Sequence, residues 1–518
     1  MVCGTGSDSG KSTLVAGICR MLARRGLRVA PFKAQNMSLN STVTATGQEI
    51  SRAQASQAQA AGVEPEAAMN PILLKPSDHR NSQVIVDGRV WGTFDAASYQ
   101  EAKADLWPLV LDRLASLRDR YDAVICEGAG SPAEINLLAH DITNLKLAEA
   151  AHLPALLVGD IDRGGVFASL YGTVAILPSE LSSLIKGFVI NKFRGDPAIL
   201  AGGLEQLEGL TGRPTLGVVP WLEGVGIDAE DSMALEACSS AGSDRFRRPS
   251  AGGDVLDVAV IRLPRISNFT DIEALSLEPA VRVRYVESAG EMGRPHLVIL
   301  PGTKTTIGDL RWLAASGLAG VITALARPLH AAAGTDMTPG GGSSGSANAT
   351  TILGICGGYQ MLGRTVADSV EEPGGAQMEG LGLLDVVTTF EESKLTRRVW
   401  GESLGQPVVG YEIHHGRTSA ISPGGPQGTW ISTQYGPEGM TSPHGNVRGT
   451  SVHGLFESDT FRRAFLSEVA RRSGVWWDPG EAVSFAAARQ ARFDVIADAV
   501  EEHLGFKAIK DLIDGARP

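Results

Sequence analysis

The stretch Gly4-Thr5-Gly6-Ser7-Asp8-Ser9-Gly10-Lys11-Ser12-Thr13 has the composition of a loop that binds phosphate. Successive backbone N–H groups followed by the N-terminus of a helix form an anion site. A lysine directly after the last glycine brings positive charge to the outer phosphates, and the hydroxyl residue that follows the lysine is suited to binding Mg²⁺. Lys11 and Ser12 occupy these two positions. The stretch therefore predicts a nucleoside triphosphate site at the start of an α/β domain.

The predicted ATP contacts come from this loop and from one residue further along the chain. They are Gly4, Thr5, Ser7, Asp8, Gly10, Lys11, Ser12, Thr13 and Asn191. The spacing departs from G-x-x-x-x-G-K-[ST], because Gly4 stands six residues before Gly10 instead of five. This longer form resembles the dethiobiotin-synthetase-like branch of P-loop enzymes. The resemblance implies phosphorylation of a carboxylate-type group.

Short apolar runs alternate with helical stretches in the N-terminal half, which is typical of an α/β domain with a parallel sheet. We expect a helix over 12–25 and strands over 27–32, 123–126, 155–159, 187–190 and 216–219. Only Met1-Val2-Cys3 precede Gly4. Either the strand before the loop is therefore very short, or further residues precede it.

Glu127 directly follows the apolar run 123–126 and is followed by glycines. Ligands bind at the carboxyl ends of strands in open parallel sheets, and Mg²⁺ prefers few carboxylates together with phosphate oxygens and water. We therefore predict that Ser12 and Glu127 hold Mg²⁺ beside the phosphates. Asp8, Asp160 and Asp162 are weaker candidates for the same surroundings.

A second α/β region follows, with expected strands over 255–263, 297–300 and 351–355. Small, polar and charged residues at 239–253 predict a linker, and the low-complexity residues 331–350 predict a mobile insertion. Helical candidates near the end are 461–472 and 490–504. The expected domains are 1–238, then 254–460 after the linker, and a mostly helical tail over 461–518.

Cys356 lies in Leu353-Gly354-Ile355-Cys356-Gly357-Gly358, a pattern typical of a nucleophile on a tight turn between a strand and a helix. A thiolate there is suited to attack on a carboxamide, with a histidine moving the proton and backbone N–H groups holding the oxyanion. His453, 97 residues later, is the predicted histidine. Gly302, in the turn after the strand 297–300, and Gly357 are the predicted oxyanion and glutamine contacts.

The C-terminal region thus resembles the triad-type glutamine amidotransferases. Many of these enzymes have a glutamate two residues after the histidine, whereas this chain has Leu455 there. We therefore expect a Cys–His dyad and assign no acid, although Glu457 is nearby. His414 and His415 either line the site or are structural.

Composition limits the alternatives. A net charge of −12 argues against nonspecific nucleic-acid binding, which needs a basic surface. The five cysteines include no Cys-x-x-Cys pair, so neither a disulfide framework nor a zinc site is expected. No apolar run approaches the roughly 20 residues of a membrane span. We expect a cytoplasmic enzyme without a prosthetic group, and the sequence does not indicate an oligomeric state.

Long strings in both halves identify a family. These strings resemble cobyric acid synthases, the glutamine-hydrolysing amidases of cobalamin biosynthesis, over nearly the full chain. They include residues 31–40, 54–58, 69–76, 127–137, 159–167, 263–271, 300–304, 410–417 and 453–457. Three features differ from the family pattern. Only three residues precede the phosphate loop, Thr305 stands where the family tends to have asparagine, and residues 331–350 form an insertion.

The resemblance implies the reaction. The b, d, e and g carboxylates of adenosylcobyrinic acid a,c-diamide would become amides, each using one ATP and one glutamine through an acyl phosphate. The corrinoid and glutamine are the expected binding partners. Four residues in polar loops after the first strands are candidate substrate contacts, namely Lys33, Gln35, Asn36 and Lys75.

Other functions share parts of the pattern. The sister enzyme cobyrinic acid a,c-diamide synthase has both domain types, but residues 33–40 and 410–417 favour the cobyric acid synthases. Nucleotide-switch proteins of the partitioning type carry a further lysine five residues before the loop lysine, where this chain has Gly6. A non-catalytic scaffold does not account for Lys11, Ser12, Cys356 and His453 together.

Overall fold

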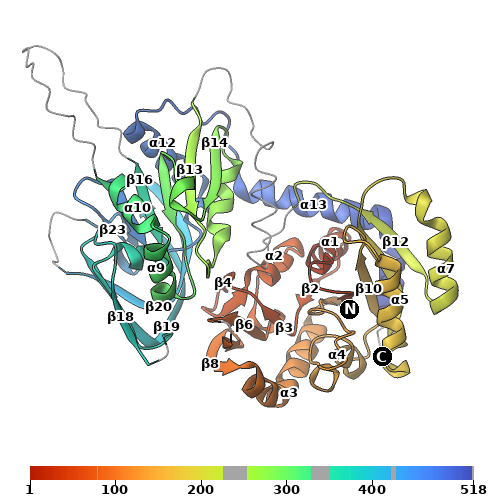
Figure 1. The fold of residues 1–518 in the computed structure, drawn as a ribbon. Coiled ribbons are helices and arrows are strands. Elements are labelled where there is room, and N and C mark those ends of the chain that lie inside the picture. Colours follow the sequence, from red (N-terminus) through yellow and green to blue (C-terminus); the bar gives the residue numbers. More distant parts are fainter. Residues whose placement is uncertain (79, 226–253, 328–349, 373, 422–427, 516–518) are drawn as a thin grey trace, which may run out of the picture. The chain divides into compact units, whose positions relative to one another are not determined.

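The computed structural model describes residues 1–78, 80–225, 254–327, 350–372, 374–421 and 428–515 (Figure 1). The chain divides into two compact units. Unit 1 comprises Met1–Glu230 and Ala488–Pro518, and unit 2 comprises Asp231–Ala487. The expected linker, 239–253, and residues 331–349 of the expected insertion lie outside the described residues.

A parallel sheet organises unit 1. Its strands, in spatial order, are β1 (Val2–Gly4), β10 (Ala155–Asp160), β11 (Ile185–Phe193) and β12 (Thr215–Pro220). The parallel pair β2 (Val29–Phe32) and β9 (Ala123–Cys126) adjoins it, because Val2 forms a parallel bridge with Glu127. The strand before the loop is therefore very short, and its pairing with β10 and with the residue after β9 holds it inside the sheet.

Two smaller sheets and the remaining helices complete this part of unit 1. The sheets are β3 (Gln35–Met37), β6 (Ile72–Pro76), β7 (Asn81–Val86) and β8 (Arg89–Asp95), and the pair β4 (Ser41–Val43) and β5 (Glu49–Ser51). The helices are α1 (Lys11–Arg24), α2 (Arg52–Ala60), α3 (Ala96–Arg120), α4 (Leu145–Ala150), α5 (Val166–Ile176), α6 (Ser179–Ser182) and α7 (Ala201–Thr211).

The end of the chain does not form one tail. Helix α12 (Asp459–Ser473) belongs to unit 2, whereas α13 (Phe485–Leu504) from Ala488 onward and α14 (Phe506–Asp514) belong to unit 1. The expected mostly helical segment 461–518 is thus divided between the two units, and Figure 1 shows the blue α13 beside the red α1.

Apolar packing explains this return of the chain to unit 1. Ile496 and Val500 of α13 are fully buried in one cluster with residues of α1. A Cβ on Gly17 of α1 would lie 2.7 Å from a methyl carbon of each, so the glycine permits the close approach of the two helices. Burying such a side chain contributes roughly 1.5–3 kcal/mol, whereas the partly exposed ion pairs between the two helices, Arg20–Asp494 and Arg24–Asp498, contribute about 1 kcal/mol or less.

A mixed, mostly parallel sheet organises unit 2. Its order is β14 (Val281–Val286), β13 (Leu256–Ile261), β15 (Leu297–Leu300), β16 (Thr351–Ile355), β24 (Val447–Thr450) and β23 (Met440–Thr441), with only β23 antiparallel. All three predicted core strands of this region are confirmed. Its helices are α9 (Thr306–Ala315), α10 (Leu318–Ala326), α11 (Gly357–Leu362) and α12.

A second sheet in unit 2 is built on a long antiparallel hairpin. Its strands are β17 (Thr365–Asp368), β18 (Ala376–Glu379), β19 (Val386–Ser403), β20 (Gln406–Ala420), β21 (Ile431–Thr433) and β22 (Gly436–Glu438). Across the described residues no single helix has the length and apolar character to cross a membrane, whereas α9 and α10, which meet at an 88° bend, satisfy both criteria only as a pair.

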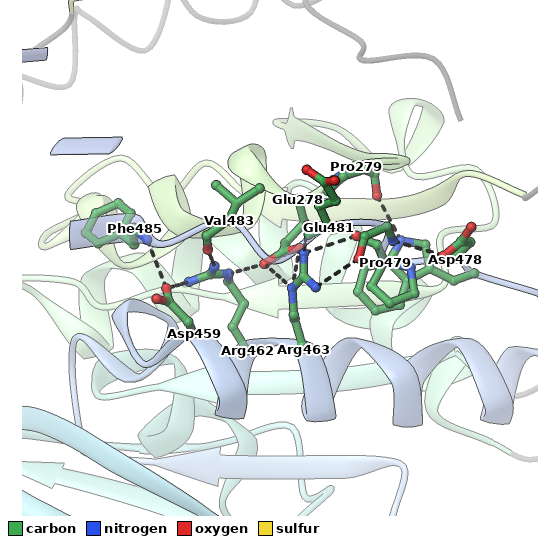
Figure 2. A network of polar contacts seen from close by, with 12 residues as sticks. Glu278, Pro279, Asp459, Arg462, Arg463, Asp478, Pro479, Glu481, Val483 and Phe485 are labelled. Carbon is green, nitrogen blue, oxygen red and sulfur yellow. Dashed lines mark hydrogen bonds and ion pairs between the residues drawn. The ribbon is translucent and has the colours of Figure 1, made fainter. Parts of the chain in front are cut away.

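A buried ionic network fixes the segment that leads from α12 to α13 (Figure 2). Arg462 is fully buried and donates to Glu278 Oε1 at 2.7 Å, to Asp459 Oδ1 at 2.8 Å and to the carbonyl of Val483 at 2.8 Å. Arg463 also pairs with Glu278 and donates to the backbone of residues 479–481. The two guanidinium groups thus hold a segment that has no regular structure of its own.

Replacing Arg462 with methionine leaves the buried Glu278 with a single cationic partner and removes the donor to Val483. We expect the variant to lower the free energy of unfolding of unit 2 by about 3 kcal/mol, because removing one member of a buried ion pair leaves uncompensated charge. Urea unfolding followed by circular dichroism measures this change. Arg364→Met, which removes an exposed pair with Asp385 in the same unit, is the control and should leave the midpoint nearly unchanged. Equal midpoints for the two variants would contradict the assignment.

Candidate active sites

The phosphate loop connects β1 to α1. The N–H of Thr5 donates to the carbonyl of Val158 at 2.9 Å, which continues the pairing of β1 with β10 into the loop. Gly10 has φ +90°, and a Cβ there would lie 2.0 Å from Asn191 Nδ2, so the position requires glycine on both grounds. Asn191 donates to the carbonyl of Ser9 at 2.9 Å. Asn191, which the sequence predicts as an ATP contact, therefore lies against the loop and supports its backbone.

Two side chains meet at Glu127, Ser12 from the loop and Lys33 from the residues after β2. Lys11 folds back over the loop and donates to the carbonyls of Gly6 at 2.9 Å and Gly130 at 3.2 Å. Ser12 Oγ donates to Glu127 Oε1 at 2.9 Å, and Lys33 Nζ donates to the same oxygen at 2.8 Å. The predicted pair Ser12 and Glu127 is thus in contact, and Lys33 joins it.

Glu127 is buried and is nevertheless held as a carboxylate. Burial raises the pKa of this group, but the Lys33 ammonium and the donors Gln57 and Ser12 outweigh that effect and lower the pKa. Gln57 Nε2 donates to Glu127 Oε2 at 2.5 Å. The sequence did not single out Gln57 by role, although it lies within the string 54–58.

The other predicted residues of this site lie around the loop. Ser7 and Asp8 are exposed, while Thr5 and Thr13 are half-buried. Asp8 accepts from Arg163, which follows β10, at 3.1 Å. Asp160 is buried and pairs with Lys192 at 2.8 Å, and Asp162 contacts Arg194 at 3.4 Å. These two acids are therefore already engaged with basic side chains.

The predicted substrate residues are not in open polar loops, which corrects that expectation. Gln35 and Asn36 lie on β3 and Lys75 lies on β6, while only Lys33 follows a strand. Tyr99 donates to Gln35 at 2.6 Å. Asn36 donates to Ser51 and to Gln54, and Lys75 forms a buried pair with Glu49 at 2.7 Å. Hydrogen bonds within unit 1 hold all four side chains.

Cys356 lies on the turn between β16 and α11, with φ +50° and ψ −107°. Non-glycine residues rarely adopt such a backbone, and the strain costs about 1–3 kcal/mol. Gly357 and Gly358 follow, and a Cβ on Gly358 would lie 1.9 Å from the carbonyl oxygen of Leu300. The glycines therefore let the turn close tightly against the end of β15, which presents Cys356 at the carboxyl edge of the sheet.

An acid does hold the histidine, which corrects the expectation of a dyad. His453 Nδ1 lies 2.6 Å from Asp271 Oδ2, and the N–H of Gly454 donates to Asp271 Oδ1 at 2.8 Å. Asp271 lies on the 3₁₀ helix η4 (Phe269–Leu277), 182 residues before the histidine. Sequence spacing could not locate it, although it ends the string 263–271 that carried the resemblance.

His453 is also fixed by its other neighbours. Burial lowers the pKa of this imidazole, but the carboxylate of Asp271 and the sulfur of Cys356 outweigh burial and raise the pKa to about 10. The ring stacks on Tyr411 with centroids 5.4 Å apart, and the backbones of the two residues exchange hydrogen bonds. Cysteine, histidine and aspartate are thus brought together from three separate stretches of sequence.

The predicted oxyanion residues flank this group. A Cβ on Gly302 would lie 2.9 Å from His453 Cε1, and a Cβ on Gly357 would lie 2.6 Å from Thr303 Cγ2. Gly357 is the first residue of α11, so its N–H has no acceptor within the helix. A side chain at either position would therefore collide with a neighbouring residue of the site.

The two histidines of β20 are held by backbone carbonyls. His414 Nδ1 lies 2.6 Å from the carbonyl of Gly416, and His415 Nδ1 lies 2.9 Å from that of Glu391. Burial lowers the pKa of His415 to about 4, so this ring is neutral near pH 7. Both rings therefore support the β19–β20 hairpin, which also carries Tyr411.

Comparisons with known proteins agree for both units. Residues 1–235 match the family model described as the CobQ/CobB/MinD/ParA nucleotide binding domain, and residues 257–333 and 344–461 match the CobB/CobQ-like glutamine amidotransferase domain. Cobyric acid synthase of Mycolicibacterium paratuberculosis is 50% identical over 518 residues, which covers 100% of this chain and 97% of the relative. Those of Frankia casuarinae and Rhodococcus jostii are also 50% identical, covering all of this chain and 97% and 96% of their own.

The chain belongs to the cobyric acid synthase family. Members of this family with a glutamine amidotransferase domain are glutamine-dependent amide ligases, and this chain is one of them. Unit 1 contains the nucleotide-binding domain and unit 2 the glutamine amidotransferase domain.

The nucleotide-binding half of this family member has donors that fit a magnesium ion. The oxygens of Ser12 and Glu127 converge, and Gln57 Oε1 and Ser9 Oγ are buried without a hydrogen-bond partner among the described residues. Among the described residues, no group of three or more His, Cys, Asp or Glu side chains could hold a metal ion. A site of one hydroxyl and one carboxylate suits Mg²⁺, which takes its other ligands from phosphate and water.

The strained turn at Cys356 gives a stability prediction for the glutamine half. Both Cys356→Gly and Cys356→Ala remove the thiol, but alanine retains a Cβ at φ +50°. We expect the glycine variant to be more stable than the alanine variant by about 1 kcal/mol.

Thermal or urea unfolding of the two variants provides the measurement. Ala259→Gly, on the buried strand β13, is the control, and there glycine should be the less stable residue in the usual way. A glycine variant at 356 that is less stable than the alanine variant would show that the turn stores no strain.

Proposed function

We propose that this enzyme amidates the b, d, e and g carboxylates of adenosylcobyrinic acid a,c-diamide, using ATP, Mg²⁺ and glutamine. The observation that carries the proposal is the presence of both sites in one chain whose relatives, cobyric acid synthases, match it over its whole length. The alternative is the two amidations of cobyrinic acid a,c-diamide synthase. Residues 33–40 and 410–417 favour the first reaction.

Ammonia would be produced at Cys356. Its thiolate attacks the side-chain carbonyl carbon of glutamine, and the new C–S bond places negative charge on the carbonyl oxygen. The backbone N–H groups of Gly302 and Gly357 stabilise that oxyanion. His453 gives a proton to the departing nitrogen, the C–N bond breaks, and ammonia leaves.

The thioester is then hydrolysed by the same groups. His453 takes a proton from water, whose oxygen attacks the carbonyl carbon, and the C–S bond breaks to give glutamate and the thiolate. Asp271 keeps the imidazole in the orientation that this proton transfer needs and stabilises its charged form. No other group is required to balance the reaction.

Unit 1 would activate the corrinoid carboxylate. When ATP binds, Lys11 would exchange its hydrogen bonds to the carbonyls of Gly6 and Gly130 for contacts with the outer phosphates. The backbone N–H groups of the loop would bind the phosphates as well. Ser12 and Glu127 would hold Mg²⁺, which neutralises charge on the phosphates when bound. Transfer of the γ-phosphoryl group gives an acyl phosphate, from which ammonia displaces phosphate to form the amide.

Incubation with adenosylcobyrinic acid a,c-diamide, ATP, Mg²⁺ and glutamine tests the reaction, with mass spectrometry of the corrinoid as the measurement. We expect four successive acid-to-amide steps. Two steps on cobyrinic acid and none on the diamide would instead establish the alternative. Lys11→Ala should abolish amidation with either nitrogen source, because it removes phosphate binding.

Cys356→Ala separates the two halves of the reaction. We expect it to lose glutamine-dependent amidation and to retain amidation when ammonium is supplied at high pH, since unit 1 keeps its site. Phosphate release and corrinoid mass report the result. Failure of ammonium to rescue a variant that still hydrolyses ATP would count against free ammonia as the intermediate.

Asp271→Asn tests the third member of the site. Asparagine preserves the shape but does not stabilise the imidazolium, so we expect the glutamine-hydrolysis kcat to fall at least about 100-fold. Ammonium-dependent amidation should be unchanged. The matched control is Glu457→Gln, which changes the nearest acid in sequence and should retain full activity; the reverse ranking would show that the acid was wrongly assigned.

A further inference from the structure

Two loops beside Cys356 are joined by a short antiparallel pairing. The N–H of Ser267 donates to the carbonyl of Gly302 at 2.8 Å, and the N–H of Lys304 donates to that of Arg265 at 3.0 Å. Between them Ile266 and Thr303 form an antiparallel bridge. One loop leads to Asp271 and the other is the oxyanion-side turn, so the pairing links two parts of the glutamine site.

One buried carboxylate extends this pairing. Asp309, in α9, is 2% exposed, and its Oδ2 accepts from Thr303 Oγ1 at 2.5 Å and from the N–H of Arg265 at 3.2 Å. A single oxygen therefore contacts both loops. Thr303 Oγ1 also lies 3.0 Å from the carbonyl of Arg265 and accepts from the N–H of Thr305 at 3.2 Å.

The contacts of these loops show what a displacement would disturb. A Cβ on Gly357 would lie only 2.6 Å from the methyl carbon of Thr303, and a Cβ on Gly302 would lie 2.9 Å from His453 Cε1. Asp271 follows Arg265 by six residues. A shift of the Arg265–Thr303 pairing therefore moves an oxyanion donor and the acid that orients His453 together.

We propose that Asp309 is a positioning residue for glutamine hydrolysis, which holds the oxyanion-side turn and the Asp271 loop in register through Thr303 and Arg265. This inference rests on the proposed role of Cys356 in glutamine hydrolysis. Asp309 touches neither the nucleophile nor the histidine, and acts only through the two loops.

The electrostatics of the group agree with this role. Burial raises the pKa of Asp309 to about 6 against the donors Thr303 and Arg265, so the carboxylate is ionised near pH 7 and accepts both hydrogen bonds. The shortest hydrogen bond that Asp309 accepts comes from Thr303, so its closest partner belongs to the oxyanion-side turn and not to the N-terminus of α9.

Oxyanion donors act mainly in the transition state, so their misplacement should reduce kcat more than glutamine binding. We expect Asp309→Asn to lower the kcat of glutamine hydrolysis about 10- to 100-fold, the effect of shifting a reacting geometry by up to about 1 Å. The KM for glutamine should change less than about threefold, because ground-state contacts are largely retained. Ammonium-dependent amidation should stay at the wild-type rate.

Variants of the partner residue test the route of the effect. Thr303→Val should reproduce the loss of kcat. Thr303→Ser, which retains the hydroxyl, should keep a kcat near that of the wild-type protein. The double variant Asp309→Asn with Thr303→Val should be no slower than the slower single variant, because the first change weakens and the second removes the same Asp309–Thr303 contact. Multiplied losses in the double variant would overturn the proposal.

A matched buried acid controls for loss of folding. Asp257, on β13 of the same unit, is 7% exposed and pairs with Arg282 and Arg284 away from the two loops. Asp257→Asn should retain the wild-type kcat even if it lowers the melting temperature. Equal losses of kcat in the Asp257 and Asp309 variants would show a general effect of stability and overturn the proposal.

The outcome is distinguishable from failure of the proposed function. A wild-type protein that does not hydrolyse glutamine would refute the role of Cys356 itself, and the role of Asp309 with it. A wild-type protein that hydrolyses glutamine, together with an Asp309→Asn variant of unchanged kcat, would refute only the positioning role.

Discussion

The parallel register of the central strands is the constraint on which both sites depend. In unit 2, Leu300 pairs with Gly354 and Ile355 pairs with Thr450, so β15, β16 and β24 end at one edge of the sheet. The oxyanion-side turn, Cys356 and the segment leading to His453 are the residues that follow these three ends. Residues distant in sequence thus become neighbours because their strands run in the same direction.

Unit 1 uses the same principle with different side chains. Gly4 pairs with Val158, and the bridge between Val2 and Glu127 brings the end of β9 to the start of the phosphate loop. Asp160 pairs with Asn191, whose side chain then reaches the loop. A three-residue first strand is sufficient because it is enclosed on both sides.

The sequence predicted most of this arrangement, because the strands are apolar and the catalytic turns are rich in glycine. Strands β9, β15 and β16 have the predicted bounds, and the two predicted magnesium residues, Ser12 and Glu127, lie in contact. What the sequence could not show were contacts made between distant segments. Lys33 and Lys75 were predicted as substrate contacts in polar loops, whereas they pair with the buried carboxylates of Glu127 and Glu49. The return of α13 to unit 1 depends on Gly17, and local pattern gives no indication of it.

The position of Leu455 explains why the acid of the glutamine site comes from elsewhere. Leu455 is buried in the apolar core of unit 2 together with Phe456 and Phe461, so a carboxylate there would lose its hydration without gaining a partner. Asp271 instead satisfies both oxygens, one with the imidazole of His453 and one with the N–H of Gly454. One carboxylate therefore holds both the histidine ring and the backbone of the next residue. A proton-transfer site is defined by this geometry and not by residue spacing, since the same three groups occur in different chain orders on unrelated folds.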